Sequence, residues 1–557
     1  MSKNHKTPHR QTQESRHATN VQPQTQATPR RHRLPSPETL SLLLVFVLTW
    51  WWAAVWYGDV FAIAREHSFW APNSLLMYFE QGKPGWPIWL AGRALLTLYH
   101  WTWLGGLVVA ALVTLTCWAL RQVTWTRLTR KAIPALRERH SQPWWRILLR
   151  EIFVHLPAAA WMVWVAYEGF DAYFEKENGQ LLGSLLAMAV VLGVVGILGR
   201  LSQKDVHADH DSIDKWHYAV CLSPVVMVGI TMIITTTWRP YVRVVTQMER
   251  QMMAQDWEGV KETARAHTDL SYRLIAAYYA VALVQTNQQC TNLFDIRLDY
   301  DEPYLHGYNG GENNGCNYYI ETCDYHSGLI ETSIHHAMEQ MTMSHPSLRT
   351  LKLLTKCALM RSEWAVARKY LRILKEVPFE GDFIARYSPM VGRKDLVDAD
   401  PEMRQIRLTE PIHDAMESGY TKPVFLGYYA DLMEGRSKNA LWNSLAVNIY
   451  SKRMDAFMER LAPLAGTTLP QNVSDAVVCL SAKHPELMNQ FQGMKFSRDR
   501  FAGFLREVKP YISDRERYSY ELFDRYRGYY GYYYFFGNLR ATKQSTETQT
   551  SSNSGVN

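Results

Sequence analysis

The sequence predicts an all-α protein in which a polytopic helical membrane block, residues 39–238, precedes a soluble α-helical domain, residues 239–540. Three observations predict this class. Apolar segments of about 20 residues, the length at which a helix crosses a bilayer, recur along the first half. The second half repeats apolar residues at helical spacing, and patterns typical of strands are scarce throughout.

The composition also points to a membrane. The chain of 557 residues carries 20 Trp and 31 Tyr, and these amphipathic rings are favoured at membrane–water interfaces. The net charge of +7 is small for this length, and the mean hydropathy of -0.25 averages an apolar first half with a polar second half. The sequence has no interleaved basic and aromatic patch of the kind that binds nucleic acid. The predicted non-protein partner is the lipid bilayer.

Five apolar segments predict five membrane-spanning helices. The first two are free of charged residues, and five such runs in succession are not expected in a globular core. The segments are Thr39–Tyr57, Trp101–Leu120, Ile152–Phe170, Leu181–Gly199 and Tyr218–Trp238.

Lys and Arg in the short connections predict how these helices are oriented. Residues 1–38 carry seven Lys or Arg and are expected to form a disordered basic tail in the cytoplasm. Residues 121–150 carry eight Lys or Arg against one Glu and should also lie in the cytoplasm. Residues 58–100 are poorer in basic residues and are expected outside the cytoplasm. Five spans then place residues 239–540 outside the cytoplasm, followed by a disordered tail, 541–557.

The connection 58–100 contains aromatic and polar residues around the turn sequence KPGWP, residues 83–87. We expect two interfacial or re-entrant segments, one on each side of that turn. A sixth span within this connection is the alternative, and it would reverse the predicted side of the second half.

Helix pairs are predicted along the second half. Trp257 and Ala264 share one helical stripe, and Trp364–Leu374 repeats a pattern of Trp, small and aromatic residues similar to that of tetratricopeptide repeats. A third pair is expected in residues 422–464, with a polar turn at Gly435–Asn439. The predicted domain is therefore a tetratricopeptide-like helical array, and a helical domain without a repeat is the alternative.

The stretch 294–328 is rich in Asn, Gly and Asp and predicts a loop. Its acidic residues do not follow calcium-loop spacing and its Cys and His residues do not follow zinc spacing, so no metal and no cofactor is predicted. If the second half faces an oxidising space, Cys316 and Cys323 are the candidate disulfide in this loop. Cys357 and Cys479 lie in apolar helical patterns and should be buried thiols.

Catalytic signatures are weak in this sequence, which has no Gly-rich phosphate loop, no GxSxG and no HExxH motif. Because ionisable residues at membrane depth are functional candidates, Asp59, His155 and Glu168 are the candidate catalytic residues. Interfacial solvation is the alternative for Asp59 and Glu151, which lie near the ends of predicted spans. His155 and Glu168 lie inside one predicted span.

The densest aromatic cluster, Tyr529–Phe536, stands just before the polar C-terminal tail. We expect these rings to cover the open end of the helical array, because a terminal repeat lacks a neighbour on one side. Docking onto the bilayer surface is the alternative, and the nearby Arg residues would suit it.

Several segments carry a family resemblance. They are WLGGLVV in the second span, DWEGVKETARAH, YYAVALVQTNQ, HSGLIETSIHHAMEQ, CALMRSEWAVARKYLRIL and GYYGYYYFFGN. In the order and spacing of these segments, the chain resembles an uncharacterised family of bacterial inner-membrane proteins, a domain of unknown function, over most of residues 40–538. The resemblance implies a multi-pass protein of the bacterial inner (cytoplasmic) membrane with helical repeats, and it implies no reaction. With the predicted orientation, the C-terminal domain would be periplasmic.

Two classes of function fit these observations. The first is a membrane-anchored scaffold or binding protein of the cell envelope, whose helical array gathers envelope proteins on an extended surface. The alternative is a membrane enzyme or carrier that acts on a lipid-linked or envelope substrate, with Asp59 as its acid–base candidate. The lack of catalytic motifs favours the scaffold.

Overall fold

The computed structural model describes residues 36–72, 82, 84–130, 144–174, 179–201, 215–270, 273–298, 320–343, 345–411 and 438–537. Within these ranges every regular element is a helix, and the β-type pairing is limited to an isolated bridge between Thr468 and Gln492. The predicted all-α class is therefore confirmed for the described residues. Apart from residues 36–38, both predicted tails lie outside these ranges.

Five helices in the described residues are long and apolar enough to cross a membrane. They are α1 (Pro37–Trp51) with its π-helical extension η1 (Trp52–Trp56), α4 (Thr102–Arg130), α5 (Trp144–Phe174), α6 (Gly179–Leu201) and α7 (Lys215–Thr237). Each overlaps one of the five apolar segments predicted from the sequence, which confirms that prediction. We call residues 37–237 the membrane block and the residues from Trp238 onward the second half.

The outer surface of the membrane block is apolar. Leu43, Phe153, Val191 and Ile233, one from each of four spans, are more than half exposed. A soluble protein rarely leaves so continuous an apolar surface in water. Exposed Trp side chains lie near the ends of the spans, where aromatic residues gather in membrane proteins: they are Trp50, Trp51, Trp101, Trp103, Trp144, Trp145 and Trp238. These features indicate a membrane protein.

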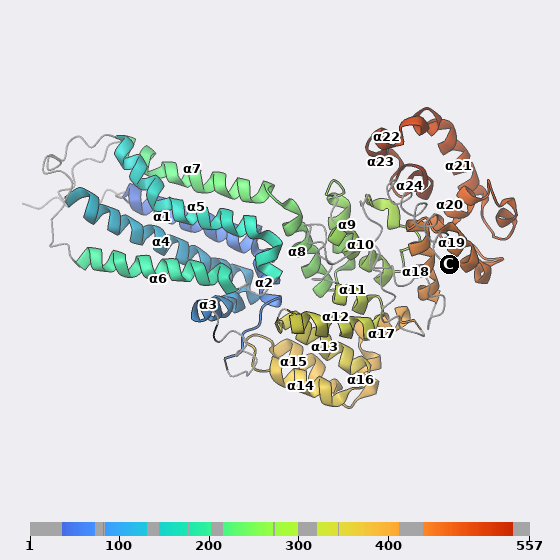
Figure 1. Ribbon diagram of the computed structural model, residues 1–557, viewed down its shortest axis with the longest axis horizontal. Coiled ribbons are helices and arrows are strands. Elements are labelled where there is room, and N and C mark those ends of the chain that lie inside the picture. The colour runs from blue at the N-terminus through green and yellow to red at the C-terminus, as the bar shows by residue number, and fades with distance from the viewer. Residues whose placement is uncertain are drawn as a thin grey trace, which may run out of the picture.

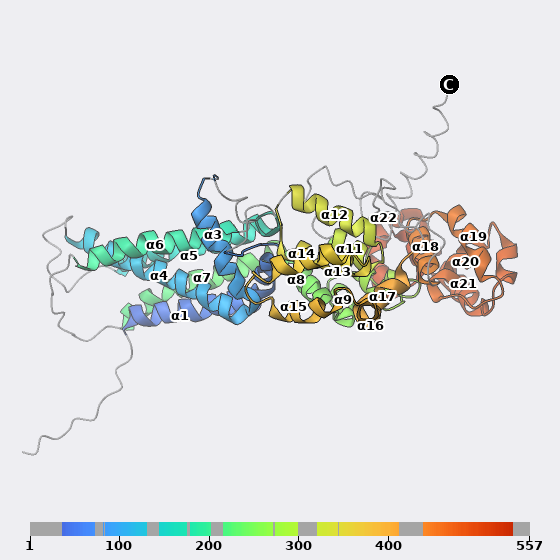
Figure 2. The ribbon, with the colours of Figure 1, turned by 90° about the horizontal axis from the view of Figure 1, so that it is seen from below.

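The chain crosses the block in alternating directions (Figure 1). Helices α1, α5 and α7 run towards the second half, and α4 and α6 run away from it. The second half therefore lies beyond the end of the block opposite to the start of α1, an arrangement that the turned view also shows (Figure 2). On which side of a membrane each end of the block lies stays a prediction.

Two short helices occupy the connection between the first two spans. Helix α2 (Gly58–Glu66) packs on η1 and on α8 of the second half, whereas α3 (Trp86–Leu96) packs on α6. Neither is long enough to cross a bilayer. The described part of this connection therefore holds two short helices and no sixth candidate span, while residues 73–81 and 83 lie outside the described ranges. That these segments are interfacial or re-entrant stays a prediction.

Glycines bring α3 and α6 into close contact. A Cβ atom on Gly92 of α3 would collide with the backbone of Gly179 and Gly183 on α6. Gly179 and Gly183 are four residues apart, so they lie on one face of α6, as in the small-residue contacts by which membrane helices approach each other. This packing fixes α3 against the side of the membrane block.

The second half consists of short helices that pack against their neighbours along the chain. Their bounds are α8 (Pro240–Met253), α9 (Trp257–Ala266), α10 (Arg273–Gln285), α11 (Ile320–His326), α12 (Ile330–Met343), α13 (Leu348–Met360), α14 (Trp364–Leu374), α15 (Gly381–Tyr387), α16 (Lys394–Ala399), α17 (Pro401–Thr409), α18 (Lys438–Tyr450), α19 (Met454–Leu461), α20 (Gln471–Leu480), α21 (Lys495–Val508), α22 (Arg515–Glu521), α23 (Phe523–Tyr526) and α24 (Tyr530–Phe536). Antiparallel-type pairs form between α9 and α10, α11 and α12, α13 and α14, and α18 and α19.

The same turn geometry follows three helices of the second half, α8, α13 and α18. Gln255, Ser362 and Lys452 have left-handed φ angles of 57°, 61° and 54°. In each case the next residue donates its backbone N–H to the carbonyl five residues earlier, over 2.8 to 2.9 Å, as in a helix C-cap. The chain thus repeats a helix–turn–helix step after α8, α13 and α18.

The predicted turn of the third helix pair lies mostly outside the described residues, and the structure shows a further turn that sequence reasoning missed. Within the predicted turn Gly435–Asn439, the described residues Lys438 and Asn439 already belong to α18, and the turn of the α18–α19 pair lies at Ser451–Arg453. The left-handed position is occupied by Lys452, whose residue type is not a turn signal.

The aromatic run near the C-terminus is buried within the second half. Tyr529, Tyr530 and Phe536 are no more than 1% exposed, and α24 packs on α20, α21 and α22. The ring of Phe294 lies 5.2 Å from that of Tyr530, so the run also contacts a segment near α10. Helix α24 lies far from the membrane block (Figure 1). The rings therefore fill the core near the end of the second half, as the sequence predicts for a terminal cap.

Candidate functional site

A cavity of about 480 Å³ lies where the membrane block meets the second half. Its walls come from α2, from η3 (Thr97–His100) just before the second span, from α8, and from α11, α13, α15 and α17. The volume is within the range of small-molecule sites. The lining contains six Lys or Arg and five Asp or Glu: Arg65, Arg250, Arg349, Lys352, Lys356, Arg386, Glu66, Glu249, Glu380, Asp382 and Glu402. We call this space the junction cavity.

Helix α13 supplies three of these cations. Arg349, Lys352 and Lys356 follow one another at spacings of three and four, so they share one face of the helix. The leucines between them pack into the apolar core. The backbone N–H of Leu348 donates to the carbonyl of Ser68 over 2.9 Å, which fixes the start of α13 against the segment that follows α2.

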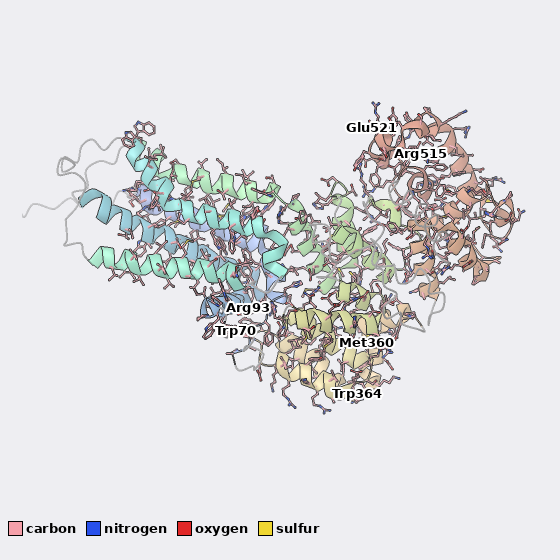
Figure 3. The ribbon with its side chains drawn as sticks, in the orientation of Figure 1. Trp70, Arg93, Met360, Trp364, Arg515 and Glu521 are labelled. Atoms are coloured by element: carbon pink, nitrogen blue, oxygen red, sulfur yellow. The ribbon has the colours of Figure 1, made fainter. Side chains whose placement is uncertain are left out.

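The segment after α2 is buried against the second half. An apolar cluster joins the two parts through Phe69, Ala71, Leu348, Leu351, Leu374 and Val377. Arg93 of α3 is 1% exposed and donates from Nη1 to Oγ of Ser68 over 3.4 Å. Figure 3 shows Arg93 and Trp70 at this seam. Apolar packing therefore accompanies the charged contacts of the cavity.

Four charged residues join the membrane block to the second half at the cavity. Arg65 and Glu66 end α2, Lys352 is on α13, and Glu380 precedes α15. Nζ of Lys352 lies 3.0 Å from Oε2 of Glu66 and 2.8 Å from Oε2 of Glu380, and Arg65 pairs with both carboxylates. Burial opposes ionisation of Glu66, but the charges of Lys352 and Arg65 outweigh it and lower its pKa. We call these four residues the junction ion-pair cluster.

A second buried group continues from the end of α2. His67 lies 3.3 Å from Oε1 of Glu249 through its Nε2, and Arg349 lies 3.5 Å from the same carboxylate oxygen while pairing with Glu321. Burial and the charge of Arg349 lower the pKa of His67. Burial opposes ionisation of Glu249, but the His67 hydrogen bond and Arg349 lower its pKa. The group joins α2, α8, α11 and α13.

The inner wall of the cavity centres on Glu402. Nζ of Lys356 lies 2.7 Å from Oε1 of Glu402, and the hydroxyl of Tyr387 donates to Oε2 over 3.0 Å. Burial alone would raise the pKa of Glu402, but Lys356 and the hydrogen bonds lower it to about 2. The neighbouring His326 is buried, which lowers its pKa to about 4 and leaves its imidazole neutral near pH 7.

Part of the exposed lining of the cavity lies near the start of the second span. Its exposed lining residues include Met253, Phe379 and His100, and His100 stands two residues before the second span. The ring of Phe379 contacts Trp101, with 5.0 Å between ring centroids. Trp101 is one of the exposed Trp residues at the span ends. This part of the lining is therefore beside the expected membrane–water interface.

Two of the three predicted catalytic residues have described side chains, and these two lie on different helices and do not contact each other. Asp59, in the first turn of α2, is partly exposed and pairs with Arg250 at the cavity edge. His155 is fully buried in α5, where its Nδ1 donates to the carbonyl of Glu151 over 2.8 Å. Glu168 lies on the same helix, but its side chain is outside the described residues. Of the two whose side chains are described, Asp59 lies near the junction cavity and His155 does not line it.

Glu151 corrects one sequence-based interpretation. It was expected to be solvated at an interface, but it is fully buried in the block. Its carboxylate pairs with Arg121 and, over 2.7 Å, with Arg150. Arg121 also donates to the backbone carbonyl of Glu38 over 2.8 Å. These contacts join α1, α4 and α5 at the end of the block far from the second half, because a charge buried there requires a partner.

The cysteines are buried where they are described. Cys357 and Cys479 are buried as predicted, and burial raises the pKa of the Cys357 thiol to about 12. Cys323 is buried in α11 rather than in an open loop. Cys316 lies outside the described residues, so its pairing with Cys323 stays a prediction. No group of three or more potential metal ligands gathers among the described residues.

Sequence reasoning missed the junction cavity. Glu66 and Lys352, whose side chains pair, are 286 residues apart, and no local pattern links them. The spacing of Arg349, Lys352 and Lys356 is the one available signal, because it puts three cations on one face of a helix with an apolar core side. That signal alone would also fit an ordinary solvated helix face.

Comparison with protein families yields a match over most of the chain. A family model described as "Family of unknown function (DUF6057)" matches residues 136–537. The matched range contains α5 to α24, and thus the cavity walls from α8 onward. No curated protein and no solved structure matches the chain.

Proposed function

Because the chain belongs to this family of unknown function, whose name carries no activity, we propose from its structure that it is a membrane-anchored scaffold or binding protein of the bacterial cell envelope. The supporting observation is the junction ion-pair cluster, in which Arg65 and Glu66 of the membrane block pair with Lys352 and Glu380 of the second half. Buried ion pairs require defined geometry. They hold the helical array in one orientation at the membrane, as a platform for partners requires.

The proposal includes placement in the inner membrane, with a cytoplasmic N-terminus and a periplasmic second half. The basic excess in residues 121–150 supports this orientation. Alkaline phosphatase, which is active only outside the cytoplasm, should be active when fused after Gln247 and inactive when fused after Arg137. The reverse pattern would contradict the proposed orientation.

We also propose that the second half is a tetratricopeptide-like array. The recurring turn at Gln255, Ser362 and Lys452 supports it, because repeated helix–turn–helix units share one local geometry. An array of this kind presents side chains from successive helices to an extended partner. Val366 and Met338 offer such a surface: both are exposed, and Tyr370, one turn after Val366, contacts the sulfur of Met338 at 3.7 Å.

Binding fits the junction cavity better than catalysis does. A general acid needs a pKa near the working pH, but the pKa values of Glu66, Glu249 and Glu402 are all lowered. These carboxylates are ionised near pH 7 and hold cations. Asp59, the acid–base candidate, is itself paired with Arg250.

The second candidate function is a membrane enzyme or carrier that acts on a lipid-linked or envelope substrate. The existence of a polar cavity beside the membrane favours it. It requires one essential carboxylate, whereas a repeat scaffold presents residues from successive helices to its partner and needs no carboxylate in particular. The two functions therefore predict different responses to single substitutions.

The experiment is photo-crosslinking in intact cells. A photoreactive residue at Met338 or at Val366 should capture the same few envelope proteins, while one at Leu149, which is exposed on a membrane span, should capture no such protein. If neither array position captures a protein, and Asp59→Ala alone reproduces the deletion phenotype in abundant, folded protein, the enzyme or carrier replaces the scaffold.

A further inference from the structure

Helix α14 carries a basic stripe on its exposed side. Arg368, Arg372 and Lys375 follow one another at spacings of four and three, so they share one side of the helix, and all three are exposed. The helix contains no acidic residue. None of the three cations makes an ion pair with a described residue, although the exposed Glu376 follows Lys375 directly. The stripe is therefore available to an anionic surface.

The last turn of α14 lies next to the membrane block. Helix α13 runs away from the block and α14 runs back towards it, since Met360 and Trp364, between these helices, lie on the side away from the block (Figure 3). At the other end, Leu374 packs in the apolar cluster that joins the two parts of the chain. Arg372 and Lys375 are thus the cations of the stripe nearest to the block.

The segment after α14 holds Phe379 against the start of the second span. The side chain of Phe379 is 40% exposed, and its ring centroid lies 5.0 Å from that of Trp101. Trp101 directly precedes the candidate span Thr102–Val123 and is itself exposed, as aromatic residues are at a membrane–water interface. Phe379 therefore continues the aromatic surface of the span end onto the second half.

The backbone keeps the ring of Phe379 at this surface. Its φ angle of 67° is left-handed, which is unfavourable for a bulky side chain. The chain is fixed on both sides of it, because Val377 belongs to the buried apolar cluster and Glu380 to the junction ion-pair cluster. Strained positions that the surrounding structure enforces are typical of binding surfaces.

Helices α13 to α16 extend past the side of the membrane block, where the surrounding bilayer would lie. Figure 1 shows them below α6, at the lower edge of the spans, with α14 and α15 next to the end of the block. From Arg368 to Lys375 the helix rises by about 10 Å. Charges interact over about the same distance at 0.1 M salt. All three cations are then within reach of the charge on a lipid surface.

From these observations we infer that Phe379 and the basic stripe of α14 dock the second half onto the bilayer surface, where the stripe recognises anionic phospholipid head groups. The ring enters the interface beside Trp101, and the three cations face the lipid phosphates, a combination typical of interfacial membrane contacts. The inference goes beyond the scaffold proposal. It requires only that the five spans cross a membrane, and it holds for either orientation of the chain.

The test is lipid photo-crosslinking by the purified full-length chain in nanodiscs. The nanodiscs contain phosphatidylcholine alone or with about 30% phosphatidylglycerol, which makes the surface anionic. A photoreactive phenylalanine analogue replaces Phe379, and mass spectrometry of the labelled peptide identifies lipid adducts. The control analogue replaces Phe496, which is 64% exposed on α21, far from the membrane block (Figure 1).

We expect lipid adducts at position 379 and none at position 496. Phosphatidylglycerol should raise the yield at position 379 by about threefold or more, because it attracts the basic stripe. Salt at about 500 mM should remove this increase by screening the charges. The lipid and salt dependence is measured on a chain whose stripe is intact, so it tests the inference without any substitution of the cations.

Arg372→Gln combined with Lys375→Gln is the diagnostic variant, since it removes the two charges nearest to the bilayer and keeps long polar side chains. Its yield at position 379 in phosphatidylglycerol nanodiscs should fall to that in phosphatidylcholine alone. The matched control is Lys495→Gln combined with Arg498→Gln, two exposed cations of α21, and it should leave the yield unchanged. An unchanged melting temperature shows that the diagnostic variant is folded.

Three results would overturn the inference: no lipid adduct at position 379, equal yields with and without phosphatidylglycerol, or an effect of phosphatidylglycerol that persists in the diagnostic variant. Crosslinking of position 379 to another protein in place of lipid would also overturn it, because the surface would then be a protein interface. The crosslinks from Met338 and Val366 test the scaffold separately.

Discussion

Nζ of Lys352 lies 3.0 Å from the carboxylate of Glu66, and this contact joins α13 of the second half to α2 of the membrane block. Lys352 also lies 2.8 Å from Glu380, so one ammonium group bridges two carboxylates. Arg65 completes the cluster. These charged groups are largely removed from water, so each is stabilised by its partners in the cluster. Removing one charge leaves the others buried without a partner, which destabilises the folded protein.

Lys352→Met should therefore destabilise the chain by about 3 kcal/mol, the lower end of the effect expected when one partner of a buried pair is removed. Thermal unfolding of the purified protein measures the change. Lys369→Met is the control, because Lys369 is exposed on α14. Equal melting temperatures for the two variants would show that the cluster does not hold the junction.

The spans and the junction differ in how far the sequence predicts them. A span is local, since 20 consecutive apolar residues between polar ends suffice to indicate it, and all five candidate spans in the described residues were located from such runs. The cavity is not local, because Glu66 and Lys352 are 286 residues apart. Local patterns specify which residues share a helix face but not which faces meet.

Turns illustrate the same limit on a smaller scale. Glycine would mark a left-handed position, because it adopts positive φ without a steric cost. Here Ser362 and Lys452 occupy such positions, held by hydrogen bonds from the following residue to the preceding helix. The tertiary packing of the helix pair selects the turn, and the sequence alone does not reveal it.

Acid should weaken the inner wall of the cavity through Glu402. Its folded-state pKa of about 2 lies below the ordinary value of 4.5. Its contribution to stability is therefore fully present above the unfolded pKa and is lost as the pH falls towards 2. Between pH 6 and pH 3 the free energy of unfolding of the wild type should fall by about 2 kcal/mol more than that of Glu402→Gln.

Denaturant unfolding at several pH values tests this prediction. Glu459→Gln is the matched control, since Glu459 is mostly exposed on α19. It should retain the acid sensitivity of the wild type. If the free energy of unfolding depended on pH in the same way for the wild type and Glu402→Gln, the pKa of Glu402 would not be lower in the folded than in the unfolded protein.

Close packing of α3 on α6 predicts opposite effects at two glycines. Gly92→Ala should destabilise the chain by about 3 kcal/mol or prevent folding, because the new methyl group collides with the backbone of α6. Gly193→Ala should be neutral or stabilise by about 0.5 kcal/mol, since nothing lies within 4 Å of its Cβ and alanine favours the helix. Yield of monodisperse protein and melting temperature report both effects. Tolerance of Gly92→Ala would place α3 elsewhere.

Asp475 predicts the opposite pH dependence in the end of the array. It lies on α20, with its carboxylate 3.3 Å from Arg500 of α21, and Arg500 in turn lies over the ring of Tyr529 in the aromatic run. Burial raises the pKa of Asp475 to about 6, against the lowering effect of Arg500. A raised pKa means that the folded state is favoured while the group is protonated, and this stability is lost as the pH rises through 6.

Between pH 5 and pH 8 the wild type should therefore lose about 1 kcal/mol of stability relative to Asp475→Asn, which cannot ionise but keeps an amide able to bond Gln471. Asp499→Asn, on the exposed side of α21, should follow the wild type. Denaturant unfolding at each pH measures the change. If the wild type instead gains stability between these pH values, the ion pair with Arg500 outweighs burial, and Asp475 holds α20 and α21 together as a charged group.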